Sequence, residues 1–148
     1  MGSQRLNCLF YDIDVVEEAG VDPDLLDSAP TFADALDTVA TETDAIPMTH
    51  DMQGILTTTR LWAAMMLGQE GFDAYMAFIN VDGDESAVRA MFETPATVLE
   101  NYINDDASTI GLIGSNENII NGDTTFIHQG NWAAGAYCTS ENFDYDED

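Results

Sequence analysis

Apolar residues in the first two thirds of the chain recur at helical spacing. Ser3 is placed to cap a first segment that ends at Gly20. Its apolar residues lie three and four positions apart and are Leu6, Leu9, Phe10, Ile13 and Val16. A strand over Leu6–Tyr11 is the alternative, because a short apolar run does not separate helix from strand.

The next segments carry clearer helix signals. Asp22-Pro23 pairs a capping residue with a proline at the first helical position, which predicts a short turn through Leu26. Thr31 then opens a helix with one apolar and one polar face. The predicted inner face holds Phe32, Leu36, Val39 and Ala40, and the outer face holds Asp34, Asp37, Thr41 and Glu42.

The longest helix is predicted over Thr49–Leu67, between Pro47 and a C-capping Gly68. Its second half is apolar nearly all round, so we expect it at the centre of a bundle. Three shorter helices are expected after it. The first contains Phe72, Tyr75, Met76 and Ile79. The second begins after the N-cap Asp84 and contains Val88, Met91 and Phe92. The third begins at Thr94-Pro95 and contains Val98, Leu99, Tyr102 and Ile103.

Beyond Asn104 the pattern changes to short runs separated by turn residues. The runs are Ser108–Ile113, Asn118–Ile120, Thr124–His128 and Asn131–Tyr137. Asn121-Gly122 between two of them is a strong hairpin signal. The pattern predicts an antiparallel meander of three or four strands, with Phe126, Trp132, Ala134 and Ala136 facing inward.

The fold class that follows is α+β. We expect an N-terminal helical bundle of about five to six helices, followed by a small C-terminal antiparallel β-meander. The length of 148 residues fits a single domain. Its parts would be a mainly helical region over 1–104, the β-meander over 107–138, and an acidic aromatic tail over 139–148.

Charge is the strongest compositional feature. The chain has no lysine and three arginines against 28 acids, for a formal net charge of -25. Spread over a folded chain of this size, that charge costs on the order of 20 kcal/mol at 0.15 M salt and about 9 kcal/mol at 1 M. Because self-repulsion of this size rivals the stability of a domain, we expect a halophilic protein adapted to molar salt.

An acidic tail or a disordered chain accounts for the acidity less well. The acids are spread evenly, with 11, 8 and 9 in successive thirds, so there is no confined acidic tail. A content of 45% hydrophobic residues argues against disorder. A mimic of DNA that binds a basic partner stays open as an alternative. Direct nucleic-acid binding is excluded by the absence of a basic patch.

Targeting signals are not found. No apolar run reaches the length that crosses a bilayer, and the first residues lack the pattern of a secretory signal. We therefore expect no membrane insertion and a protein that is cytoplasmic when synthesised, with the virion as a further location. Cys8 and Cys138 lie near opposite ends, and both a disulfide and two free thiols stay open.

Catalytic and cofactor motifs are also not found. His50 and His128 are far apart and lack metal-ligand spacing; His50 is expected in the first turn of a helix. No nucleophile elbow or phosphate-binding loop occurs. The sequence therefore predicts a non-enzyme without a cofactor. A small halophilic enzyme that uses carboxylates of Asp12, Asp14 or Asp82–Glu85 is kept as an alternative.

The function that these observations favour is a structural or assembly subunit of a halophilic system. Its most concrete form is a virion component of a haloarchaeal virus, such as a connector, completion or capsid-associated protein. Its partners would be other protein subunits. The expected interface residues are the aromatic side chains Trp132, Tyr137, Phe143 and Tyr145. An acidic inhibitor or DNA mimic is the first alternative and the small enzyme the second.

Overall fold

The computed structural model describes residues 7–26, 29–50, 68–81 and 84–137. Its centre is a three-stranded mixed sheet with the order β1-β3-β2. β1 (Asn7–Tyr11) pairs antiparallel with β3 (Thr124–Gly130), whereas β2 (Ile46–Thr49) pairs parallel with it. The central strand is thus the last of the three along the chain.

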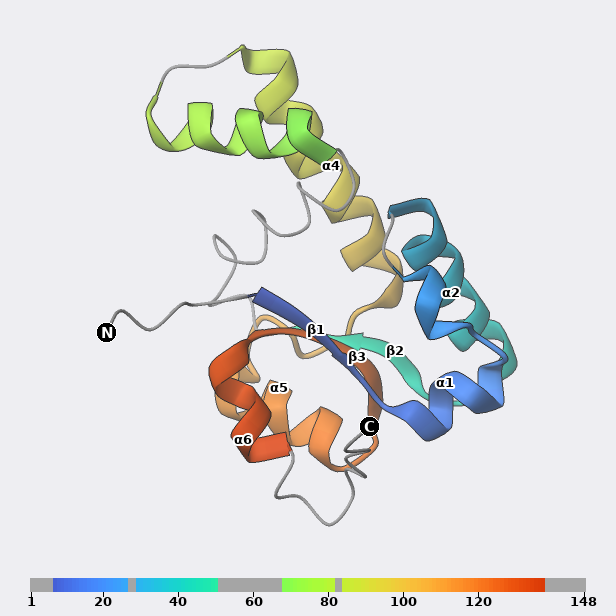
Figure 1. Cartoon of the computed structure of the whole chain (residues 1–148). Helices are drawn as coiled ribbons and strands as arrows, with labels where there is room; N and C mark the ends of the chain where they lie inside the picture. The colour runs from blue at the N-terminus through green and yellow to red at the C-terminus, as the bar shows by residue number, and fades with distance from the viewer. Residues whose placement is uncertain (1–6, 27–28, 51–67, 82–83, 138–148) are drawn as a thin grey trace.

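The helices α1 (Ile13–Ala19) and α2 (Ala29–Glu42) cover one face of the sheet, together with the 3-10 turn η1 (Pro23–Leu25) (Figure 1). Alternation along the strands decides which residues face them. The cluster beneath these helices contains Val16, Ala19, Leu26, Phe32, Ala35, Leu36, Val39, Met48 and Phe126. Phe32 meets Phe126 edge to face, with ring centroids 5.4 Å apart.

The opposite face is covered by α5 (Gly111–Ile120) and α6 (Ala134–Tyr137), with the 3-10 turn η2 (Asn131–Ala133) before α6 (Figure 1). Ile119, Ile127, Ala133 and Tyr137 form its cluster, and Phe10 packs against them. The Tyr137 hydroxyl donates to Oδ1 of Asn116 at 2.6 Å, which ties α6 to α5. The sheet is therefore enclosed between two helical layers.

A helical pair extends away from this sandwich. Residues 68–79 are helical, and α4 (Glu85–Tyr102) returns beside them to the sheet (Figure 1). Phe78 and Phe92 join the two helices edge to face, with centroids 5.3 Å apart. At the other end, the Tyr102 hydroxyl donates to Oδ1 of Asp37 at 3.1 Å, so α4 ends against α2.

Several local predictions are confirmed. The predicted end at Gly20 is confirmed, since Gly20 ends α1 in the left-handed region at φ 72; the predicted cap Ser3 lies outside the described residues, and α1 is capped by Asp12. Asp22 caps the 3-10 turn that begins at Pro23. Asp84 caps α4, since its Oδ1 accepts from the backbone N–H groups of Ser86 and Ala87. In α2 the predicted inner residues are buried except Ala40, which is exposed.

The α+β class is confirmed, but the separation into a helical bundle and a meander is wrong. Strands come both early and late in the described chain, since the segment 7–11 adopts the alternative of a strand and β3 follows the last long helix. Pro47 was expected to separate two helices, but it lies inside β2. An edge strand such as β2 tolerates a residue without an N–H. Most of the predicted helix Thr49–Leu67 falls outside the described residues, and its first position belongs to β2.

The predicted meander contains one strand instead of three or four. Thr124–His128 is part of β3, but Asn118–Ile120 and the second half of Ser108–Ile113 lie in α5. Asn131–Tyr137 is helical, so its buried residues are Ala133 and Tyr137, four positions apart. Trp132, Ala134 and Ala136, which we expected to face inward, are not buried. The predicted break at Thr94-Pro95 is also absent, because α4 runs through it. The single-domain organisation stays a prediction.

Candidate functional site

The carboxyl ends of β2 and β3 meet at one edge of the sheet because these strands are parallel. Sheets of this kind bind ligands outside the carboxyl ends of their strands. His50 follows β2 at this edge, and Asn131 and Trp132 follow β3. Asn7, the first residue of β1, lies opposite Gly130 and completes the edge. This edge is the candidate site.

Asn104 holds the end of β2 in place. Its backbone N–H donates to the Met48 carbonyl at 3.2 Å, and its Oδ1 accepts from the His50 N–H at 2.9 Å. Its Nδ2 donates to Oδ1 of Asp106 at 2.6 Å. Asn104 is 3% exposed. A buried amide with these bonds fixes the chain as it leaves the sheet.

Two histidines lie buried next to this edge. They occupy the positions after the paired residues Thr49 and Ile127 and are 4% (His50) and 8% (His128) exposed. The His128 ring packs on Phe32 of α2, with centroids 5.8 Å apart. Burial lowers the pKa of His128 to about 3, and the charge on nearby His50 lowers it further. His128 is therefore neutral at physiological pH.

The expectation that His50 lies in a surface helical turn is wrong. It follows a strand and is buried, because the apolar run before it pairs with β3. The structure also brings His50 close to His128, which sequence distance had kept apart. The two histidines follow paired residues of β2 and β3, and this is why they lie close together. The sequence alone does not show this, because the pairing of the strands has to be known first.

Trp132 is the large aromatic residue that this edge presents to solvent. Its side chain is 56% exposed, although it sits between the buried residues Gly130 and Ala133. Gln129, three positions earlier at the end of β3, is half-buried, and its Oε1 accepts from the Gly130 N–H at 3.1 Å. An edge with an exposed indole and amide residues combines an apolar surface with hydrogen-bonding groups.

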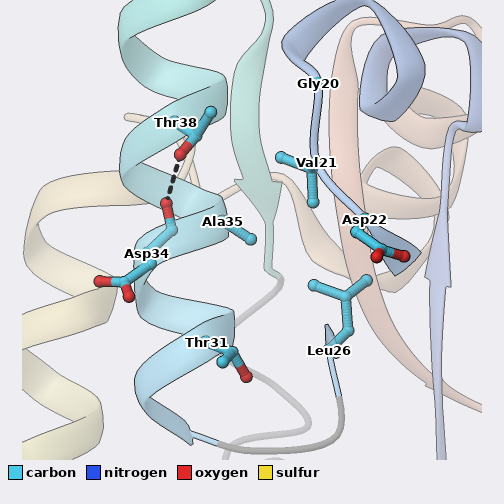
Figure 2. A pocket seen from close by; sticks show the side chains of 8 residues that line it. All are labelled: Gly20, Val21, Asp22, Leu26, Thr31, Asp34, Ala35 and Thr38. Atoms are coloured by element: carbon cyan, nitrogen blue, oxygen red, sulfur yellow. Dashed lines mark hydrogen bonds between the residues drawn. The ribbon is translucent and has the colours of Figure 1, made fainter. Parts of the chain in front are cut away.

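A separate hollow of about 180 Å³ lies between η1 and α2 (Figure 2). Val21, Leu26 and Ala35 supply its apolar wall. Two of its polar side chains form hydrogen bonds with the backbone. Asp22 Oδ1 accepts from the Asp24 N–H, and the Thr38 hydroxyl donates to the Asp34 carbonyl at 2.8 Å. It is smaller than typical ligand pockets, which hold ~300–1,000 Å³. We interpret it as a small gap in the packing between η1 and α2, and not as a ligand site.

The aromatic residues predicted to form an interface do not share one environment. Tyr137 is 1% exposed and belongs to the core, whereas Trp132 is exposed. Phe143 and Tyr145 lie outside the described residues, as does Cys138; Cys8 is a free, half-buried cysteine in β1. The interface role of the four aromatic residues stays a prediction.

Two of the carboxylates considered for a small enzyme, those of Asp12 and Asp84, serve as helix caps, whereas Asp14 is exposed in the first turn of α1 and Asp82 lies outside the described residues. Asp12 Oδ1 accepts from the Val15 N–H at 3.2 Å, and Asp84 caps α4. Hydrogen bonds from Ser86 and Ala87 lower the pKa of Asp84. In the part of the chain that the structure describes, no group of three or more His, Cys, Asp or Glu residues could hold a metal ion. None of the described helices has the length and apolar character that a membrane span requires.

Comparison with known proteins gives a consistent result. The xylose/arabinose-binding protein XacG of Haloferax volcanii is 41% identical over 147 residues, which are 99% of this chain and 32% of the relative. No protein-family model matches the chain. This chain thus spans about a third of the length of the curated relative that it matches.

Solved structures show the same fold. They are complexes of BlMnBP1, a binding protein of an ABC transporter from Bifidobacterium animalis subsp. lactis, with mannobiose and with mannotriose. The TM-scores are 0.59 and 0.55 at 22% and 21% identity, over 87% of this chain and 33% of the other. This chain therefore shares its fold with about a third of that binding protein.

These comparisons overturn the functional hypothesis drawn from the sequence. The hypothesis of a virion component or structural assembly subunit is wrong, because the comparisons point to solute binding. The expected cytoplasmic or virion location is wrong as well, since sugar-binding proteins of ABC transporters are typically extracytoplasmic. Two expectations agree with the comparisons: the named proteins are binding proteins and not enzymes, and the relative comes from a haloarchaeon.

Proposed function

We propose that this chain forms part of an extracytoplasmic sugar-binding protein of an ABC transporter, with the carboxyl edge around Trp132 as its ligand-contacting surface. The observation that carries the proposal is the 41% identity to a xylose/arabinose-binding protein over 99% of the chain. The partner of such a protein is a subunit of the transporter, so we propose a protein partner of that kind.

The chemistry of the edge suits an uncharged saccharide. One face of a pyranose ring consists largely of C–H groups, and the exposed indole of Trp132 offers a matching apolar surface. The hydroxyl groups of a sugar both donate and accept hydrogen bonds, as the amides of Gln129 and Asn131 do. Since a sugar carries no charge, the acidic surface neither attracts nor repels it.

The direct test is sugar titration in molar KCl. Xylose, arabinose, mannobiose and mannotriose are added to the chain, and also to a graft in which the chain replaces the matched 147 residues of the Haloferax relative. Binding is measured by calorimetry and by tryptophan fluorescence. We expect one of these sugars to bind the graft, and Trp132→Ala to weaken that binding tenfold or more.

A matched control is Phe72→Ala, which removes a 38% exposed aromatic side chain from the helix over residues 68–79. It should leave the affinity for sugar unchanged. Sugar affinity should also vary little between 1 and 3 M KCl, because no charge is neutralised on binding. A folded graft that binds none of the four sugars, or Trp132→Ala with wild-type affinity, would contradict the proposal.

A further inference from the structure

Gly130 is a glycine whose backbone does not require one. It is the last residue of β3, with φ -77 and ψ 155, an extended conformation that any residue adopts. It is buried, and its N–H is bonded to the side chain of Gln129. A glycine in such a position often marks the close approach of another group.

The group that approaches is the indole of Trp132. A Cβ added to Gly130 would overlap with three atoms of the six-membered ring, namely Cη2, Cζ3 and Cε3. The ring thus occupies the space where a side chain at position 130 would start. Because 56% of Trp132 remains exposed, the indole is held on one side and open on the other.

We propose that Gly130 is a positioning residue: its missing side chain lets the Trp132 indole dock against the end of β3, which fixes the aromatic surface before a ligand arrives. A side chain that is already in place loses little conformational freedom on binding. That ligand is the saccharide of the proposed function, and this part of the inference rests on that function. The docking of the indole on Gly130 does not.

A double-mutant cycle tests the docking without any ligand. Gly130→Ala is compared with wild type, and the same substitution is compared in a Trp132→Ala background. We expect Gly130→Ala alone to lower the melting temperature by several degrees. In the background without the indole it should leave the melting temperature unchanged or raise it slightly, since alanine restricts the unfolded chain. If Gly130→Ala alone does not fold, recovery of folding in the double variant gives the same answer.

Gly135→Ala is the matched control. Gly135 lies in α6, is exposed, and has no atom within 4 Å of an added Cβ. It should retain wild-type stability or gain slightly. The chain has two tryptophans, so the emission of each Trp132→Ala protein gives the contribution of Trp62 for subtraction. The remaining Trp132 emission should shift to longer wavelength in Gly130→Ala and become easier to quench with acrylamide.

Sugar binding separates the two proposals. In the graft, Gly130→Ala should weaken sugar binding about tenfold, and Gly135→Ala should not. If the folded graft binds no sugar, the proposed function fails, and the stability cycle and emission still decide the role of Gly130. An equal loss of melting temperature with and without Trp132, or unchanged Trp132 emission in Gly130→Ala, would overturn the positioning role.

Discussion

At the scale of single residues, the buried imidazole of His128 links the fold to pH. Its pKa is lowered to about 3 from the ordinary value of 6.5, because the charged form is excluded from the interior beneath α2. The unfolded chain binds a proton to this residue between those two values and the folded chain does not. Its contribution to stability is therefore fully present above pH 6.5 and is lost as the pH falls toward 3.

We expect this residue to cost about 2 kcal/mol of unfolding free energy between pH 7.5 and pH 5. His128→Gln should flatten the pH dependence by about that amount, whatever its effect on stability at pH 7.5. Urea denaturation at constant molar KCl measures both curves. Parallel curves for the variant and wild type would show that His128 titrates normally in the folded protein.

At the scale of elements, capping residues could be predicted and the identity of short apolar runs could not. Asp22 and Asp84 cap elements as expected, because a cap depends on neighbours within three residues. Residues 7–11 form a strand where the pattern favours a helix, and residues 111–120 form a helix where it favours short strands. The reason is that their partners in the sheet and the core are distant in sequence. Local sequence does not contain that information.

The dipeptide Asn121-Gly122 shows why the meander was predicted. A glycine at positive φ serves a hairpin turn and the end of a helix equally well. Here Asn121 is the C-cap of α5, and Gly122 has φ 76. For the candidate site, the sequence predicts Trp132 as an interface residue, and this stays a prediction. The place of Trp132 at the carboxyl edge depends on the parallel pairing of β2 with β3, which the sequence does not reveal.

Gly20 provides a test at this scale. It ends α1 at φ 72, and its N–H donates to the carbonyls of Glu17 and Val16. No atom lies within 4 Å of an added Cβ, so Gly20→Ala changes backbone strain alone. We expect a loss of about 1 kcal/mol in unfolding free energy, measured by urea denaturation. The same substitution at Gly135, which lacks a positive φ, should cost nothing. Equal effects at both positions would contradict this account.

At the scale of the whole molecule, the acidic surface of the described residues has little internal compensation. Among the described residues, the ion pairs join Arg89 to Glu85 at 2.9 Å and to Glu93 at 3.8 Å, all three exposed. Exposed pairs of this kind contribute little to stability. The remaining carboxylates must be screened by solvent cations, which agrees with the haloarchaeal origin of the Haloferax relative.

Stability should therefore rise with salt. Between 0.15 and 1 M KCl we expect the melting temperature to increase by about 10 °C, since about 4 kcal/mol of the relieved repulsion remains once the self-repulsion of the unfolded chain is subtracted. Circular dichroism melts at several KCl concentrations measure this. A variant with Asp14→Asn, Glu17→Gln and Glu18→Gln on the exposed side of α1 should show a shallower increase. A melting temperature that stays flat or falls with KCl would contradict the halophilic interpretation.

The position of β3 in the sheet also has a consequence for biosynthesis. The two outer strands emerge from the ribosome first, but each pairs with the middle strand, which begins at residue 124. Until that stretch is translated, the pairings that the structure describes for β1 and β2 cannot form. Folding of this sheet is thus delayed until residues 124–130 have been translated, and over that interval the unpaired apolar segments are exposed to aggregation.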